Sequence, residues 1–161
     1  VKEGPSMDSI TLFACHTSAL LLRPKVTKQV DNLVFWQPEF NGAKFVKQLM
    51  RAKRSEFEFS GLRAADDEIS GYPIPAPLLD ELSTTNINSL AIQDKKSIWV
   101  EFGSLPILPA REKLVAKYKE GNIETKLITL PVKKFWQSTE LEVSLVLINA
   151  TVDAILDMNH E

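Results

Sequence analysis

Apolar residues recur at helical spacing through the C-terminal segment of this 161-residue chain, and such a segment must be covered by other parts of the molecule on at least one side. Thr139 followed three residues later by Glu142 is a capping box, which is typical of a helix N-terminus. We therefore expect one helix from residue 140 to about 157, in preference to the strand over 141–148 that the alternation of leucine and valine also permits. The apolar stripe of this helix consists of Leu141, Leu145, Ile148, Val152, Ile155 and Leu156.

The same segment is apolar outside its main stripe, because it also contains Val143, Val146 and Leu147. A helix that is apolar on more than one face is either central to its own core or shared with a partner. Burial in the chain's own core is the favoured interpretation, and the alternative hypothesis is that the stripe forms an interface with a protein partner or with a second copy of the chain.

Residues 97–130 have the pattern of a strand, a helix and a second strand. Ser97–Phe102 and Glu124–Leu130 are rich in strand-forming residues, and a helix is predicted over 109–120 because proline suits its first turn. This spacing permits a parallel crossover without requiring one. Ser89–Gln93 with Ser97–Phe102 also fits a hairpin.

The N-terminal half contains shorter elements. Strands are expected at Ser9–Cys15 and Leu33–Trp36, which are rich in isoleucine, phenylalanine, valine and tryptophan. Residues 42–54 have the spacing of an amphipathic helix, and the alternation of glutamate and phenylalanine over Ser55–Ser60 indicates a half-buried strand. A short helix is expected near residues 77–83.

These elements predict a single α+β domain over residues 7–161, with a mixed or largely antiparallel sheet and three to four helices. The alternative is a compact α/β layer built around residues 97–130. Residues 61–77 hold two glycines and three prolines and are expected to be an internal loop. Residues 1–6, which precede the first methionine, are expected to be an artificial remnant or a tail.

The cysteine content and the hydropathy of the chain limit its class. One cysteine excludes an internal disulfide and a cysteine-based zinc site. The apolar run over 10–22 is far shorter than the roughly 20 residues that a membrane span needs, and it lacks the basic start of a signal peptide. We therefore expect a cytoplasmic, intracellular location and no membrane partner.

Charge occurs in blocks along the chain. Residues 23–63 hold nine basic and four acidic groups, whereas residues 64–94 hold six acidic groups and no basic ones. The basic groups on the predicted 42–54 helix fall within an arc of roughly 80° at 100° per residue. Together with a basic and aromatic segment near the C-terminal end, they make nucleic-acid binding a hypothesis. The residues concerned are Lys44, Lys47, Arg51, Arg54, Lys133, Lys134 and Trp136.

Candidate catalytic groups are few. Cys15 and His16 are neighbours on a predicted strand and would point to opposite faces, so they do not make a nucleophile and base pair. Glu124 and Lys126 are spaced as in metal-dependent nucleases, in which a second acid such as Glu101 or Asp94 would be needed. The sequence contains no glycine-rich phosphate loop.

We therefore predict no cofactor, no metal site and no catalytic set. The leading expectation is a non-catalytic binding or assembly module that acts through protein–protein contacts. The second is an accessory protein that binds nucleic acid through the basic 42–54 helix, and the third is a nuclease-like enzyme.

Overall fold

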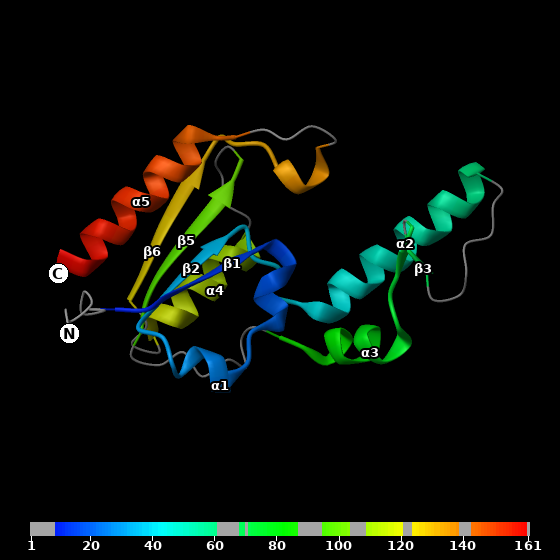
Figure 1. Cartoon of the computed structure of the whole chain (residues 1–161), viewed down its shortest axis with the longest axis horizontal. Helices are drawn as coiled ribbons and strands as arrows, with labels where there is room; N and C mark the ends of the chain where they lie inside the picture. The colour runs from blue at the N-terminus through cyan, green and yellow to red at the C-terminus, as the bar shows by residue number, and fades with distance from the viewer. Residues whose placement is uncertain are drawn as a thin grey trace, which may run out of the picture.

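A four-stranded parallel sheet forms the centre of the molecule (Figure 1). The computed structural model describes residues 9–60, 68–69, 71–86, 95–103, 109–120, 124–138 and 143–160. The strands run in the order β1-β2-β5-β6. Their bounds are Thr11–Cys15 for β1, Asn32–Trp36 for β2, Lys96–Phe102 for β5 and Glu124–Leu130 for β6.

All three pairings in this sheet are parallel, so the expected mixture of helices and strands is confirmed but a largely antiparallel sheet is wrong. Residues 97–130 adopt the crossover that their spacing permitted, with α4 (Pro109–Glu120) between β5 and β6. The hairpin expected at Ser97–Phe102 does not form, because both edges of β5 are occupied by parallel neighbours. The other half of that hairpin, at Ser89–Gln93, lies outside the described residues.

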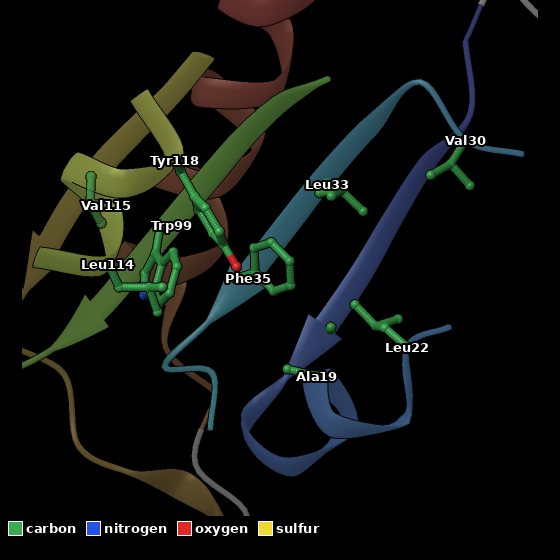
Figure 2. Close-up of a cluster of buried hydrophobic side chains, with 10 residues drawn as sticks. Ala19, Leu22, Val30, Leu33, Phe35, Trp99, Leu114, Val115 and Tyr118 are labelled. Atoms are coloured by element: carbon green, nitrogen blue, oxygen red, sulfur yellow. The ribbon is translucent and has the colours of Figure 1, made fainter. Parts of the chain in front are cut away.

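One face of the sheet packs against α4. Strand side chains alternate between faces, and Leu33, Phe35 and Trp99 lie on this side with Leu114 and Tyr118 of α4 (Figure 2). The 3-10 helix η1 (His16–Leu21) and α1 (Pro24–Thr27) connect β1 to β2. Figure 2 shows Ala19 and Leu22 beside the β1 end of the same cluster.

The opposite face packs against α5, which spans Leu145–His160. Val34, Ile98 and Val100 of the strands meet Leu147 and Met158 of the helix. The indole N–H of Trp36 on β2 donates to the Thr151 hydroxyl at 2.9 Å, and that hydroxyl donates to the Leu147 carbonyl at 2.7 Å. This side-chain contact anchors α5 on the sheet.

Helix α5 begins later than expected. Val143 and Ser144 are not helical, and the Ser144 hydroxyl accepts the Leu147 N–H at 3.3 Å as a helix cap does. The predicted start at residue 140 is therefore wrong. The capping pair Thr139 and Glu142 lies outside the described residues.

The connection from β2 to β5 forms an arm that projects from the sheet on the side away from α5 (Figure 1). It contains α2 (Gly42–Ser60), the short antiparallel pair β3 (Glu68–Ile69) and β4 (Tyr72–Pro73), and α3 (Ala76–Thr84). Helix α2 continues through Ser60, so the strand expected at Ser55–Ser60 is wrong. Part of the loop expected over 61–77 is the β3–β4 pair.

Gly42 fixes the base of the arm. Its N–H donates to the Thr85 carbonyl at 3.0 Å, and a β-carbon at this position would lie 1.7 Å from the Leu82 carbonyl oxygen. Only glycine allows α2 to start this close to the end of α3. An ion pair of 2.5 Å between Arg23 and Glu81 also ties the arm to the connection between η1 and α1.

Candidate functional site

Helix α5 is apolar on two faces, and only one of them is covered. The inner face packs on the sheet and consists of Leu147, Thr151, Ala154 and Met158. The outer stripe is exposed and consists of Leu145, Ile148, Val152 and Leu156. At 100° per residue the centres of the two faces lie roughly 135° apart.

The outer stripe contains most of the residues predicted to form an interface. Leu145 is 66% exposed and Leu156 is 52% exposed, whereas Leu147 on the inner face is 2% exposed. Ile155 is half-buried and packs at the margin of the sheet cluster, and Leu141 lies outside the described residues. The strongest apolar pattern in the sequence thus faces away from the core.

An apolar groove lies beside the first turns of α5. Its volume is about 510 Å³, and its walls include Trp36, Lys133, Phe135, Val143, Val146 and Ile148. Because Ile148 belongs to the outer stripe as well, the groove and the stripe form one continuous apolar surface. Phe13 on β1 extends the apolar area, since it is 48% exposed and its ring meets Trp36 edge-on at 4.7 Å.

Charge is distributed unevenly along this surface. The C-terminal half of α5 carries Asp153 and Asp157, both exposed, and Asp157 pairs with Lys126 at 2.8 Å. The N-terminal half, from Leu145 to Thr151, carries no charged residue, and exposed Lys133 lies beside it in the groove wall. The surface is therefore acidic at one end and basic at the other.

The basic residues predicted on α2 all project from the exposed part of the arm. Lys44, Lys47, Arg51 and Arg54 are exposed, and no acidic residue precedes Glu56 within the helix. The helix is thus amphipathic as expected but longer. Its half-buried side, which includes Phe45 and Leu49, is turned away from these four cations.

The second part of the predicted nucleic-acid surface is built differently. Trp136 lies in the 3-10 helix η3 (Phe135–Gln137) and packs against the α5-side cluster, with ring centroids 5.4 Å from Phe102 and 4.6 Å from His16. Its indole nitrogen is buried and meets no hydrogen-bond acceptor in the part of the chain that the structure describes. This ring is enclosed by its neighbours, whereas Lys133 and Lys134 are exposed.

Sequence reasoning missed a buried ion pair at the carboxyl edge of the sheet. Glu101 at the end of β5 and Arg111 in the first turns of α4 are 2.9 Å apart, and both side chains are buried. The same carboxylate oxygen accepts the Trp99 indole N–H at 2.6 Å, and Arg111 also donates to the Pro38 carbonyl at 2.7 Å. Burial raises the pKa of Glu101, and the Arg111 charge opposes this. The signal in the sequence for this ion pair was a glutamate that directly follows the apolar run Ile98–Val100.

Two residues that follow strands adopt left-handed backbone. His16 after β1 has φ of 48° and Gln37 after β2 has φ of 42°. The Gln37 side-chain carbonyl accepts the Phe102 N–H, which joins the ends of β2 and β5. Burial lowers the pKa of His16, with Glu39 raising it and Lys134 and Arg111 lowering it further.

The residues considered for catalysis are separated. Cys15 ends β1 half-buried, and burial raises the pKa of its thiol, which disfavours the nucleophilic thiolate. Glu124 lies opposite Lys96 at the start of β6, whereas Glu101 pairs with Thr129 near the other end of the same ladder. Asp94 lies outside the described residues. Within the described ranges, no three histidine, cysteine or acidic side chains are grouped to hold a metal ion.

No model of a protein family fits this sequence, and no curated protein aligns with it significantly. In the described parts of the chain, no helix combines the length and the hydropathy needed to cross a membrane.

Proposed function

We propose that this chain is an assembly module that acts through protein–protein contacts, and that its partner is a second copy of itself bound along the outer stripe of α5. The single observation that carries the proposal is that α5 exposes a row of four large aliphatic side chains although its other face is already buried against the sheet. Contiguous exposed apolar surface of this kind marks interaction sites in folded proteins.

Charge favours an antiparallel pair of α5 helices. In this arrangement, the uncharged N-terminal half of one helix packs against the half that carries Asp153 and Asp157 in the other. Lys133, beside the N-terminal half, then lies near the acidic end of the second copy. A parallel arrangement would bring the two acidic ends together, and the helix dipoles would also repel.

The groove takes part in the same contact. The outer stripe runs from Leu145 to Leu156 of α5, so it is about 17 Å long and roughly 10 Å wide. This strip alone is smaller than the roughly 800 Å² that each partner buries in a stable complex. The groove wall, with Phe135, Val143 and Val146, continues the strip on one side and enlarges the area available to the second copy.

Oligomeric state across a hundredfold range of concentration tests the proposal. We expect the parent chain to dimerise as concentration rises and Val152→Asp to stay monomeric with an unchanged circular dichroism spectrum, because a carboxylate at the centre of the stripe would be buried without a partner. Leu78→Asp, a matched change at an exposed leucine of α3, should dimerise like the parent chain. A monomeric parent chain, or a Val152→Asp variant that dimerises normally, would refute the proposal.

Disulfide trapping tests the orientation. In a Cys15→Ser background, Leu145→Cys and Leu156→Cys chains should cross-link with each other faster than either does with itself, because antiparallel pairing places position 145 near position 156 of the second copy. Faster cross-linking of Leu145→Cys with itself would contradict the antiparallel arrangement.

A further inference from the structure

The exposed face of α2 carries a cationic surface that the proposed assembly does not use. Its four cations, at positions 44, 47, 51 and 54, lie within an arc of roughly 80° and span eleven residues, or about 15 Å of helix. Gln48 and Ser55 border the arc and are exposed as well. Between residues 44 and 55 this basic face contains only cationic and neutral polar side chains, and exposed Glu58, one turn beyond Arg54, lies on the same side of the helix.

The position of α2 makes the basic face accessible. Figure 1 shows the arm extending away from the sheet, with α3 alongside α2 and α5 at the opposite side of the molecule. The contacts that hold α2 in the arm come from Gly42 at its start and from its half-buried side. A ligand on the basic face would thus approach a projecting helix without meeting the α5 surface.

Exposed acidic groups of the arm lie on α3 and at the C-terminal end of α2, where Glu58 follows the four cations. Asp80 and Glu81 are exposed on α3, and Glu81 pairs with Arg23. The chain as a whole carries a net charge of −2, so the excess of positive charge along this face of α2 is a local feature. A polyanion is therefore attracted to α2 and repelled by α3, which fixes the side on which it binds.

We propose that α2 binds double-stranded DNA through its basic face, by contacts to backbone phosphates. An α-helix with its side chains is about 10–12 Å in diameter. It therefore fits the major groove of B-form DNA, which is about 12 Å wide. Single-stranded binding would require exposed aromatic rings for base stacking. The basic face has none, since Phe45 and Phe57 lie on other sides of α2, and Trp136 is packed against Phe102 and His16.

Binding through phosphates has a defined salt dependence. Each neutralised phosphate contributes about −0.9 to the slope of log affinity against log salt, so four contacts give a slope of about −3.6. The affinity is expected in the non-specific range of about 10⁻⁴ to 10⁻⁶ M at physiological salt. Sequence discrimination should be weak, because Gln48 is the only exposed residue bordering the arc whose side chain is suited to reading adenine.

Fluorescence anisotropy with a labelled duplex of about 20 base pairs, at several salt concentrations between about 20 and 200 mM, tests the proposal. The test variant replaces Lys44, Lys47, Arg51 and Arg54 with glutamine. A matched control replaces Lys25, Lys28, Lys113 and Lys117, four exposed lysines on α1, its C-terminal flank and α4, with glutamine. Both variants change the net charge equally, so any difference between them reports the location of the contact. Circular dichroism confirms that both are folded.

We expect the α2 variant to bind the duplex at least tenfold more weakly than the parent chain at low salt, with the salt slope reduced by most of its value. The control should bind within about twofold of the parent chain. Absence of duplex binding by the parent chain at low salt, or equal weakening in both variants, would overturn the proposal. Tighter binding to single-stranded DNA or to polyglutamate than to the duplex would also overturn it. Since Val152→Asp leaves α2 intact, its monomeric form should still bind the duplex, which separates this proposal from the proposed assembly.

Discussion

Helices α4 and α5 cover opposite faces of one sheet, yet their outward sides differ completely. The outward positions of α4 carry Glu112, Lys113, Lys117 and Glu120, which is usual for a helix that faces water. The outward positions of α5 carry the four aliphatic residues of the outer stripe. Both helices bury a similar kind of inner face, so the needs of the core do not explain the outer stripe.

The two helices are also held by different chemistry. Helix α4 is fixed near its start by the buried Glu101–Arg111 ion pair. Helix α5 is fixed at its middle by the neutral hydrogen bond between Trp36 and Thr151, and lysines of β5 and β6 contact Met158 and Asp157 near its C-terminal end. A buried ion pair is strongly directional and costly to break. The contacts named for α5 include no buried ion pair, so this helix is held less rigidly than α4, as the proposed pairing with a second copy would favour.

The largest effect should come from breaking the ion pair on the α4 side. Arg111→Met leaves the Glu101 carboxylate buried without its cation, and we expect a loss of about 3–5 kcal/mol in the free energy of unfolding. The pKa of Glu101, already raised by burial, should rise further. A carboxyl group whose pKa is raised in the folded state contributes stability below its unfolded pKa and loses that contribution as pH rises. The decrease in the free energy of unfolding caused by Arg111→Met should therefore be larger at pH 8 than at pH 5. Urea unfolding at the two pH values measures it.

The double variant Glu101→Gln with Arg111→Met provides the control for this measurement. It removes both charges, so it should be more stable than Arg111→Met alone at pH 8 and should show less dependence on pH. Equal stability of the single and double variants at pH 8 would mean that the ion pair does not govern the packing of α4.

The two faces of α5 should respond very differently to the same truncation. Leu147→Ala on the inner face removes a side chain that is 2% exposed, and we expect a loss of about 2–5 kcal/mol in the free energy of unfolding. Leu145→Ala on the outer stripe should change the stability of the dilute chain by less than about 0.5 kcal/mol while weakening self-association. Thermal unfolding at low concentration, together with light scattering, distinguishes these effects. A large loss at Leu145 in the monomer would show that the outer stripe serves the fold.

The smallest effect on stability is expected at His16, where residues from the two sides of the sheet meet. His16 begins η1 on the α4 side, and its ring lies against Trp136 of the α5 side. Since the pKa of His16 is lowered by burial, its neutral form stabilises the fold above its unfolded pKa, and this contribution is lost as pH falls. His16→Asn keeps a residue that tolerates the left-handed backbone. The variant should lose less stability than the parent chain between pH 7.5 and pH 5.5, as measured by urea unfolding; an identical decrease would remove His16 as a titrating group.

Local composition was sufficient to predict several elements. Strand β6 and helix α4 have the predicted bounds, and β1 and β2 differ by only one or two residues at their starts. The parallel pairing of the strands was not predictable in this way, because it depends on which distant strands become neighbours. The alternation of glutamate and phenylalanine after residue 54 indicated a strand, but no neighbouring strand pairs with this segment in the described structure, and extending an existing helix costs little.

The sequence identified the residues of the candidate surfaces, but it did not show which of them are exposed and which are buried. The sequence placed the outer stripe of α5 at helical spacing, yet hydropathy alone does not say which side meets the sheet. The inner face uses Thr151 and Ala154, which are small enough to approach the strands closely, and these make a weak apolar signal. For Trp136 the error was the opposite. Its basic neighbours in the sequence suggested an exposed ring that could stack on bases, but the ring packs against Phe102 and His16.

The closed base of the arm has a consequence for the order of folding. Strands β2 and β5 are neighbours in the sheet, but 59 residues separate Trp36 from Lys96, against 16 residues between β1 and β2. Joining the ends of the longer segment costs about 1 kcal/mol more in chain entropy. If Gly42 meets Thr85 first, only residues 37–41 and 86–95 remain to be closed when β5 reaches β2. The arm then acts as a local folding nucleus that shortens the search for the central strand pairing, and the refolding rate of the sheet depends on a contact that lies outside it.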